Sequence, residues 1–431
     1  LYLTGTLGLD SAIIGSLMLA SKILDGISDV IFGTLIDRTH SKLGKARPWM
    51  LFGQVGVSLC LFLLFAIPAG STTMQYIYFF IVYTALNAVF YTANGIAYSS
   101  LVALITKNNN ERVQLGSFRF MFAVVTNIFM GFAVTGMVEK FGSGAAGWRT
   151  TALIFAIVGL VVNTISCLAV KELPEEELSG NTSEAAEEGK AVAEEKKHGF
   201  AETAKILVHN KYYLMILAIY IVYYIMSNLT TGAGVFCATY YWGDGSLLGQ
   251  FSMMKMFPVI IALAIAPVLI KKTGSMQKVN FWGYAISSVL GIPMIYFAMQ
   301  KNLSMFLLFM FIKGVFAGTL SGSLNALIAE ASGYTTRTTG VHMDGMMYSC
   351  SSLGVKVGGG IGTAAVGWLL KLGGFVGTAT VQSESAIRMI FNLYITFPFV
   401  IGIIITVLLA FLDVEKANKK WDAEHQKEAQ A

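Results

Sequence analysis

Three charged residues stand in a strongly apolar stretch near the start of the sequence. Asp25 and Asp29 lie in "SKILDGISDVIFGTLID" (21–37), and Lys22 precedes them. In a helix, residues three and four apart share one face, so these three charges fall within an arc of about 60°. A charge facing lipid costs at least about 2.5 kcal/mol. The charged face is therefore expected to point into the protein or a wet cavity.

The spacing of these charges suits several uses. A buried Lys–Asp pair would fix helix packing, but it leaves the second aspartate unexplained. Two carboxylates one turn apart suit a hard cation such as Na⁺, which prefers oxygen ligands. They suit a shared proton equally well, because like charges this close raise the pKa of one group. The pattern favours cation or proton coupling and leaves the choice between Na⁺ and H⁺ open.

Enzyme chemistry fits these aspartates poorly. An aspartyl protease needs two aspartates on facing structural elements that share one water, whereas Asp25 and Asp29 lie on the same predicted helix. The four cysteines and five histidines show no spacing typical of a transition-metal site or a disulfide framework. We therefore predict neither an enzyme nor a bound cofactor other than the coupling ion.

The composition is that of an integral membrane protein. The 431 residues are 55% hydrophobic and only 13% charged, against about 25% charged residues in a soluble protein. A net charge of +5 is too small to indicate a nucleic-acid partner. The bilayer and a small molecule are the expected partners.

Apolar runs long enough to cross a bilayer, roughly 20 residues each, recur along the chain and predict an all-α protein with eleven complete spans. They cover 11–36, 49–68, 76–105, 117–138, 150–170, 213–242, 248–270, 279–299, 303–329, 342–371 and 387–412. Most Lys and Arg residues fall on one side when 38–47 is placed in the cytoplasm. By the positive-inside rule, we expect a multi-pass protein of the cell membrane with a cytoplasmic C-terminus.

A charged segment and an internal repeat predict two helical bundles. Residues 171–212 are rich in Glu and read as a cytoplasmic linker. "LIDRTHS" (35–41) recurs as "LIKKTGS" (269–275), each at the end of an apolar run. Two homologous six-helix halves joined by a charged linker are typical of the major-facilitator fold, which we therefore predict. The expected domains are an N-terminal bundle (1–170) with a truncated first helix, the linker, a C-terminal bundle (213–412) and a tail (413–431).

Other charges near or within the spans have two interpretations each. Lys356, in "SLGVKVGGGIG", is a candidate counter-ion or substrate contact, and Arg119, in "SFRFMF", either snorkels or lines the substrate site. Lys255 and Lys313 are interpreted as snorkelling or packing charges. The basic loop after the first span fixes the membrane topology. It also offers a candidate gating network, made of Lys22, Asp37, Arg38 and Arg47.

Residues 22–49 resemble the second helix and following loop of the glycoside–pentoside–hexuronide:cation symporters, which melibiose permease typifies. The shared pattern is D-x-x-x-D, then G-x-x-x-D-x-T-x-S, then G-x-x-x-P-W. The motifs "YTANGIAYSSLV" (91–102), "ERVQLGSFRF" (111–120) and "AEASGYTTRTTGVHMDGMMYS" (329–349) follow in order. The resemblance covers essentially the whole chain and implies cation-coupled sugar symport by alternating access.

The resemblance also implies site residues. Asp25 and Asp29 would bind the cation with help from Ser28 and Thr92. Arg119 would match an arginine that lines the sugar site, and Lys356 would match a lysine near the cation site. Beside the resemblance, we take Tyr91 and Asn94 as candidates for contact with sugar hydroxyls, so the substrate-binding candidates are Tyr91, Asn94, Arg119 and Lys356.

The match is weaker where that family contacts its sugar. Gly95 stands where melibiose permease has an aspartate, and Ser99 and Ser321 replace two tryptophans. The expected substrate is therefore a glycoside, pentoside or related sugar other than melibiose. A lipid or lysolipid carrier and a proton-coupled exporter of the same fold are the alternatives.

Overall fold

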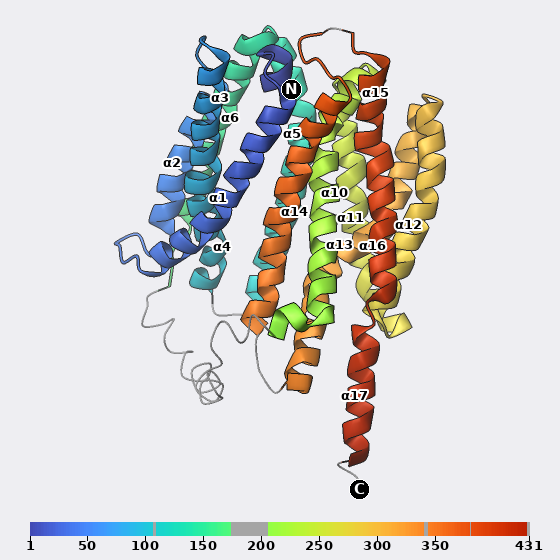
Figure 1. Cartoon of the computed structure of the whole chain (residues 1–431). Helices are drawn as coiled ribbons and strands as arrows, with labels where there is room; N and C mark the ends of the chain where they lie inside the picture. Colours follow the sequence, from blue (N-terminus) through green and yellow to red (C-terminus); the bar gives the residue numbers. More distant parts are fainter. Residues whose placement is uncertain (107–108, 174–205, 340–343, 380, 429–431) are drawn as a thin grey trace. The chain divides into compact units, whose positions relative to one another are not determined.

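The computed structural model describes residues 1–106, 109–173, 206–339, 344–379 and 381–428. Every regular element within these ranges is helical (Figure 1). The predicted all-α class is therefore confirmed.

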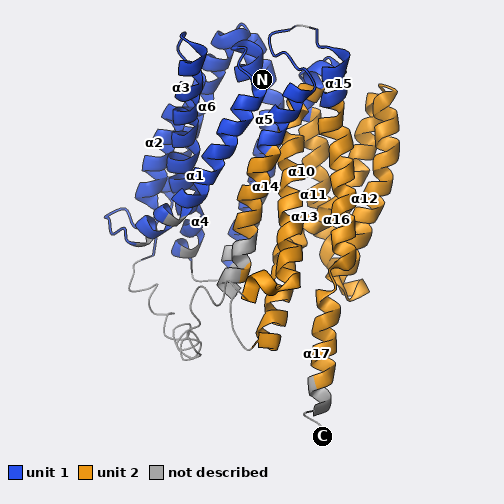
Figure 2. Ribbon diagram, in the orientation of Figure 1, with its two compact units in different colours: residues 1–187, 238–249, 363–390 blue, residues 188–237, 250–362, 391–431 orange. Residues whose placement is uncertain are grey.

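The chain divides into two compact units (Figure 2). Unit 1 comprises residues 1–187, 238–249 and 363–390, and unit 2 comprises 188–237, 250–362 and 391–431. Most of the predicted linker falls at 174–205, outside the described residues. The domain boundaries proposed from the sequence therefore stay a prediction.

Unit 1 holds the helices that carry the predicted cation site. They are η1 (Tyr2–Thr6), α1 (Ser11–Asp37), α2 (Arg47–Leu64), α3 (Thr72–Thr84), η2 (Ala85–Tyr91), α4 (Thr92–Ile105), α5 (Asn109–Lys140) and α6 (Gly144–Ala169). The elements η1 and η2 are π-helical. The predicted span 76–105 is thus a continuous run of α3, η2 and α4.

Unit 2 holds most of the later helices. They are α10 (Lys211–Phe236), α11 (Leu247–Thr273), α12 (Met276–Met299), α13 (Leu303–Thr339), α14 (Asp344–Leu372), η4 (Asn392–Thr396), α16 (Phe397–Phe411) and α17 (Val414–Glu428). The C-terminal end of α14 and the start of α11 fall in unit 1, as do most of η3 (Cys237–Trp242) and α15 (Glu384–Phe391).

Ten of the described helical segments are long and apolar enough to cross a membrane. Each of the eleven predicted runs overlaps a helix among the residues that the structure describes. The one not among the ten is α1, which carries Lys22, Asp25 and Asp29. Its 27 residues span about 40 Å at 1.5 Å per residue, so its length also suffices.

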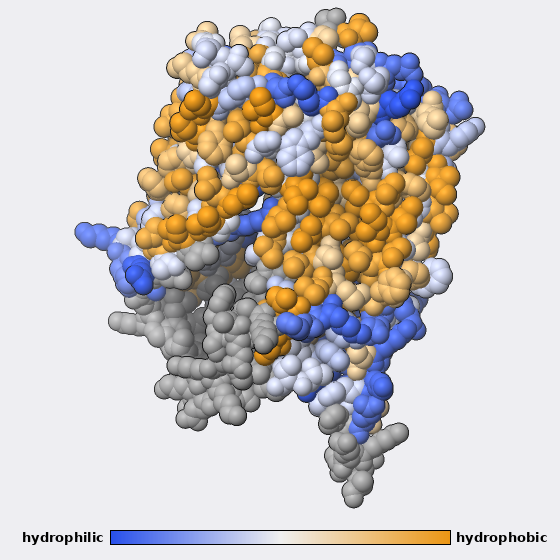
Figure 3. All heavy atoms as spheres, in the orientation of Figure 1, coloured by the Kyte–Doolittle hydropathy of each residue, from blue (hydrophilic) through white to orange (hydrophobic). Residues whose placement is uncertain are grey.

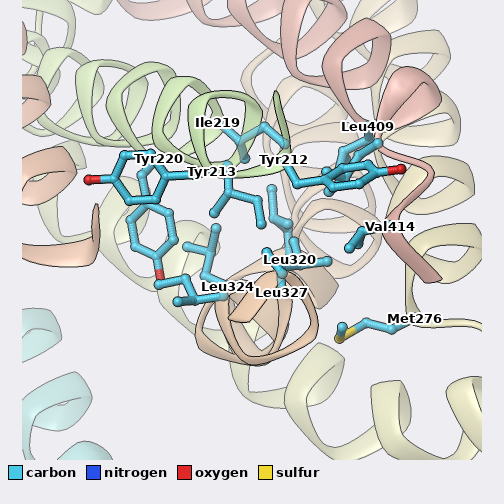
Figure 4. Packing of buried hydrophobic residues seen from close by; sticks show 14 of the residues in the cluster. Tyr212, Tyr213, Ile219, Tyr220, Met276, Leu320, Leu324, Leu327, Leu409 and Val414 are labelled. Carbon is cyan, nitrogen blue, oxygen red and sulfur yellow. The ribbon is translucent and has the colours of Figure 1, made fainter. Parts of the chain in front are cut away.

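The core of unit 2 forms between α10, α13 and α16. Tyr212, Tyr220, Leu320, Leu327 and Leu409 are almost completely buried there (Figure 4). Apolar side chains cover α16, whereas α17 is mainly hydrophilic (Figure 3). Exposed apolar side chains along a span are expected where the neighbouring medium is lipid rather than water.

The loop between α1 and α2 is held by its own motif residues. Gly44 has a φ of 105°, a left-handed conformation that favours glycine, and Ser41 Oγ donates to its carbonyl oxygen at 2.7 Å. Trp49 Nε1 donates to Thr39 Oγ1 at 2.7 Å. These contacts join the end of α1 to the start of α2.

The Glu172 carboxylate, from the segment that follows α6, binds the same loop. It accepts from the main-chain N–H groups of Lys45 (2.7 Å), Ala46 (3.0 Å) and Arg47 (2.9 Å). These three N–H groups lie just before and at the start of α2. The first N–H groups of a helix have no partner within the helix. A carboxylate also suits the positive end of the helix dipole, so Glu172 stabilises the start of α2.

Candidate functional site

The Asp25 carboxylate lies at the junction where α1 packs against η2 and α4 in unit 1. Lys22 Nζ forms an ion pair with Asp25 Oδ2 at 3.3 Å. Thr92 Oγ1 lies 2.6 Å from Asp25 Oδ1. Each carboxylate oxygen therefore has a different partner, one a cation from its own helix and one a hydroxyl from a neighbouring helix.

Thr92 is placed by the change from η2 to α4. Its side chain is buried, and its hydroxyl also lies 2.9 Å from the Asn87 carbonyl oxygen of η2. A hydroxyl carries one proton, so Thr92 can donate to only one of these oxygens at a time. Short π-helical segments often occur at functional sites, and this one brings an extra main-chain oxygen close to Asp25.

Close packing of α2 against η2 holds this junction in place. A Cβ atom added at Gly53 would lie 2.8 Å from the Phe90 carbonyl oxygen, and one at Gly56 would lie 2.0 Å from the Phe90 ring. Small residues allow helices in membranes to approach closely. The backbone just before Thr92 is therefore fixed against α2.

The remaining cation candidates lie on the same helix. Ser28 Oγ donates to the main-chain carbonyl of Asp25 at 2.9 Å, along the helix rather than to the carboxylate. Asp29 follows one turn after Asp25 and is half-buried, as Asp25 is. The predicted shared role of Asp25 and Asp29 stays a prediction.

Asn94 belongs to a polar chain that sequence reasoning missed. Its Nδ2 donates to Gln54 Oε1 at 2.9 Å, and Gln54 Nε2 donates to Ser58 Oγ at 3.3 Å. Ser58 Oγ in turn donates to the Ala156 carbonyl at 2.9 Å. Gln54 is a polar residue in an apolar span, and that contrast was a signal that could have identified it.

Arg119 and Tyr91 remain accessible. The Arg119 guanidinium donates to Ser99 Oγ at 3.0 Å and lies 4.4 Å above the centre of the Tyr98 ring. The Tyr91 side chain is 62% exposed. Arg119 thus contacts α4 at Ser99, one of the positions where the resembling family has tryptophan.

The other predicted charges are placed as follows. Lys356 is half-buried in α14 of unit 2, while the carboxylates belong to unit 1. Arg47 Nε donates to the Cys167 carbonyl at 2.8 Å. Arg38 ends α1 and is exposed, and the Asp37 side chain lies outside the described residues. Their proposed gating roles stay predictions.

A second ion pair in unit 1 was not predicted from the sequence. Asp10 pairs with Lys371, from the end of α14. Asp10 also caps α1 by accepting from the N–H groups of Ala12 at 2.9 Å and Ile13 at 3.3 Å. The hydrogen bond from Lys371, followed by those from the backbone, holds the pKa of Asp10 below its ordinary value despite partial burial.

The ten membrane-length segments among the described helices and the charged face of α1 are typical of a multi-pass membrane transporter. The chain belongs to the MFS/sugar transport protein family, whose model matches residues 1–416. This is a transporter family and not an enzyme family. The resemblance to glycoside–pentoside–hexuronide:cation symporters within the major facilitator superfamily is confirmed.

Two curated relatives cover most of the chain. The isoprimeverose transporter of Lactiplantibacillus pentosus is 26% identical over 434 residues, which cover 100% of this chain and 87% of the relative. The putative glycoside/cation symporter YagG of Escherichia coli (strain K12) is 23% identical, over 97% of this chain and 87% of the relative.

Solved structures support the fold. A bacterial homologue of the human lysosomal transporter Spinster, solved in an inward-facing and unoccupied conformation, matches with a TM-score of 0.65. The match covers 97% of this chain and 92% of that chain at 13% identity. This likeness establishes the major-facilitator fold alone.

Proposed function

We propose that this chain is a cation-coupled symporter that carries a glycoside, a pentoside or a related sugar by alternating access. The observation that carries the proposal is the Asp25 carboxylate, held between Lys22 and Thr92 on the helices of a sugar-transport family. The names of the relatives, an isoprimeverose transporter and a putative glycoside/cation symporter, support it.

The charges of the α1 face suit one monovalent cation. Lys22, Asp25 and Asp29 together carry a formal charge of −1, so one Na⁺ or one H⁺ makes the set neutral. Neutralisation matters because a net charge in a low-dielectric environment is costly. The cation would compete with Lys22 for Asp25, and it would draw on the oxygen atoms of Thr92 and Asn87 at the same junction.

The sugar would bind to residues that follow this junction along α4 and α5. Tyr91 and Thr92 are adjacent in sequence, so ordering of Thr92 by a cation also orders the exposed Tyr91 ring. Arg119 offers donors that suit sugar hydroxyls. Asn94 presents its amide already oriented by Gln54, and Lys356 is a further candidate for contact with the sugar.

The expected location is the cell membrane, with the C-terminus in the cytoplasm. The distribution of Lys and Arg supports this orientation.

Uptake of radiolabelled isoprimeverose and related glycosides into proteoliposomes tests the proposal. We expect accumulation that depends on a Na⁺ or H⁺ gradient and that disappears in Asp25→Asn, while Ser16→Ala, elsewhere on α1, keeps it. If the protein binds lysolipid but no sugar, or exports its substrate against a proton gradient, the proposal is wrong and one of the alternatives takes its place.

A further inference from the structure

A cavity of about 180 Å³ lies in unit 2 and includes none of the residues proposed above to bind the cation or the sugar. Its lining includes Ser321, one of the two positions where the resembling family has tryptophan. Its lining comes from α10, α11, α12, α13 and the η4–α16 segment. A cavity of roughly 150 Å³ holds a benzene molecule, so this one has room for a ring or a short chain.

Each helix contributes one face to the cavity. On α13, Met310, Lys313, Ala317 and Ser321 recur at helical spacing. Two glycines between them let α11 approach. A Cβ atom at Gly314 would lie 2.8 Å from Pro258 Cβ, and one at Gly318 would lie 2.6 Å from Ala262 Cβ. The cavity wall between α11 and α13 is therefore tightly packed and built into the fold.

Two lysines face this cavity. Lys255 Nζ donates to the Ser227 carbonyl at 3.2 Å, to Thr230 Oγ1 at 3.1 Å and to Thr231 Oγ1 at 2.7 Å. All three acceptors are neutral. Within the described part of the chain, the Lys313 ammonium has no hydrogen-bond or ion-pair partner. The interpretation of both lysines as snorkelling or packing charges does not account for their shared cavity.

The described residues that line the cavity include no aspartate or glutamate. Two acidic residues of unit 2 are bound to other groups. Glu330 accepts from Asn418 at 2.9 Å, and Glu415 accepts from the Gln277 N–H at 3.0 Å. Both lysines are half-buried, and a charge drawn away from water usually needs a partner of opposite sign. The described residues of the cavity wall supply none.

A buried hydroxyl in the cavity wall also lacks a partner. The Tyr284 side chain is only 2% exposed, and its OH has no hydrogen-bond partner among the described residues. Tyr223 OH, by contrast, is paired with Ser321 Oγ at 2.7 Å. Buried polar atoms are rarely left unsatisfied, so the Tyr284 hydroxyl indicates a ligand that accepts a hydrogen bond.

We propose that this cavity binds an organic anion, a carboxylate carried on an apolar ring or short chain. The carboxylate would pair with Lys255 and Lys313 and accept a hydrogen bond from Tyr284 OH. The apolar body would pack against Met226, Met254, Met310, Phe306 and Phe399, which also line the cavity. Flexible methionine side chains adapt to varied apolar shapes, and few placed polar groups with apolar walls are typical of small-molecule sites.

Binding of benzoate to the purified full chain in lipid nanodiscs tests this inference. We expect benzoate to bind, and benzamide, which has the same shape without the charge, to bind at least about tenfold more weakly. Hexanoate is the short-chain probe and is expected to compete with benzoate. If benzamide binds as well as benzoate, or if neither benzoate nor hexanoate binds, the inference is wrong.

Lysine variants locate the site. Lys255→Met and Lys313→Met should each weaken benzoate binding at least about tenfold and leave benzamide binding unchanged. Lys272→Met is the matched control, because Lys272 is an exposed lysine at the end of α11, and it should bind benzoate like the wild type. Unchanged benzoate affinity in both cavity variants would place the anion elsewhere and refute the proposed site.

A third substitution covers the case in which a lysine variant does not fold. Tyr284→Phe keeps the ring and should weaken benzoate binding about threefold or more. Sugar uptake by the same variant should persist, because none of the proposed sugar or cation contacts lies in this cavity. Equal benzoate affinity in wild type and Tyr284→Phe would contradict the role given to the hydroxyl.

Discussion

The Thr92 hydroxyl lies 2.6 Å from Asp25 Oδ1, so the first residue of α4 contacts a carboxylate in the middle of α1. The contact joins two helices 67 positions apart in sequence. Binding of a cation or a proton to Asp25 would therefore change the hydrogen bond of Thr92 at the start of α4, next to the residues proposed to bind the sugar.

Substitution of Thr92 tests that link. Thr92→Val keeps the shape of the side chain and removes the hydroxyl, whereas Thr92→Ser keeps the hydroxyl. The Thr92 oxygen is a proposed ligand of the cation, and its proton can turn to the Asn87 carbonyl oxygen. Because valine lacks this oxygen ligand, we expect Thr92→Val to weaken cation binding roughly tenfold or more. Cation-dependent sugar binding measures the effect. Equal loss in Thr92→Val and Thr92→Ser would show that the hydroxyl is not the cause.

The Lys22–Asp25 pair makes a prediction about charge. Lys22→Gln removes the positive charge that competes with the cation, and the α1 face then carries a formal charge of −2. We expect the cation to bind more tightly, by about threefold or more. Its release inside the cell should then be slower, so net uptake slows. The concentration of cation at half-maximal sugar binding reports the first effect. A Lys22→Arg variant, which keeps the charge, should behave like the wild type.

Asp10 has two separable roles, a helix cap for α1 and an ion pair with Lys371. Asp10→Asn keeps the cap and loses the pair, which contributes little to stability because the Lys371 side chain is exposed. Asp10→Ala loses both, and the cap adds about 1 kcal/mol. Thermal unfolding of the purified protein should therefore rank wild type above Asp10→Asn and Asp10→Ala last. The reverse order of the two variants would contradict the capping role.

The pH dependence of that pair follows from the lowered pKa of Asp10. A group with a depressed folded-state pKa stabilises the fold above its unfolded value, near 3.9, and loses that contribution as the pH falls through the lower folded value. We expect the difference in unfolding temperature between wild type and Asp10→Asn to be constant from pH 5 to 8. A difference that disappears between pH 7 and 6 would point to another titrating group.

Two glycines of the shared motif have different reasons to be glycine. Gly44 has a φ of 105°, and a Cβ atom there would also lie 2.4 Å from the Glu172 carboxyl carbon. We expect Gly44→Ala to destabilise the α1–α2 loop by about 1–3 kcal/mol. Gly33 is the matched control, because an added Cβ would meet nothing within 4 Å. Thermal unfolding that is equally affected in both variants would contradict this account.

The membrane helices were predictable because apolar length is a local property of the sequence. The residues of the α1 face were predictable for the same reason, since spacing on one helix follows from its period. The family resemblance placed Thr92 among the residues expected to bind the cation, and the structure adds its direct contact with Asp25. Ser28 illustrates the limit, because the sequence did not show that its hydroxyl donates to the main-chain carbonyl of Asp25 along the same helix; its role in cation binding stays a prediction.

Contacts between distant segments could not be read from local pattern. Asp10 and Lys371 are 361 positions apart, and Gln54 and Asn94 are 40 apart. Neither contact could be predicted from a periodic spacing in the sequence. Lys255 and Lys313 likewise looked like separate charges on separate spans, and only the packing of α11 against α13 brings them to one cavity.

The central claim is that the α1 carboxylates make sugar binding depend on a cation, and sugar affinity measured across Na⁺ concentrations and pH tests it most directly. Cation and sugar should strengthen each other's binding by an equal factor, about 5–150-fold. The dependence should be lost in Asp25→Asn and Asp29→Asn while some sugar binding and exchange persist. A folded, active wild-type protein whose sugar affinity is indifferent to both Na⁺ and pH would contradict the account, because the carboxylates would then serve packing alone.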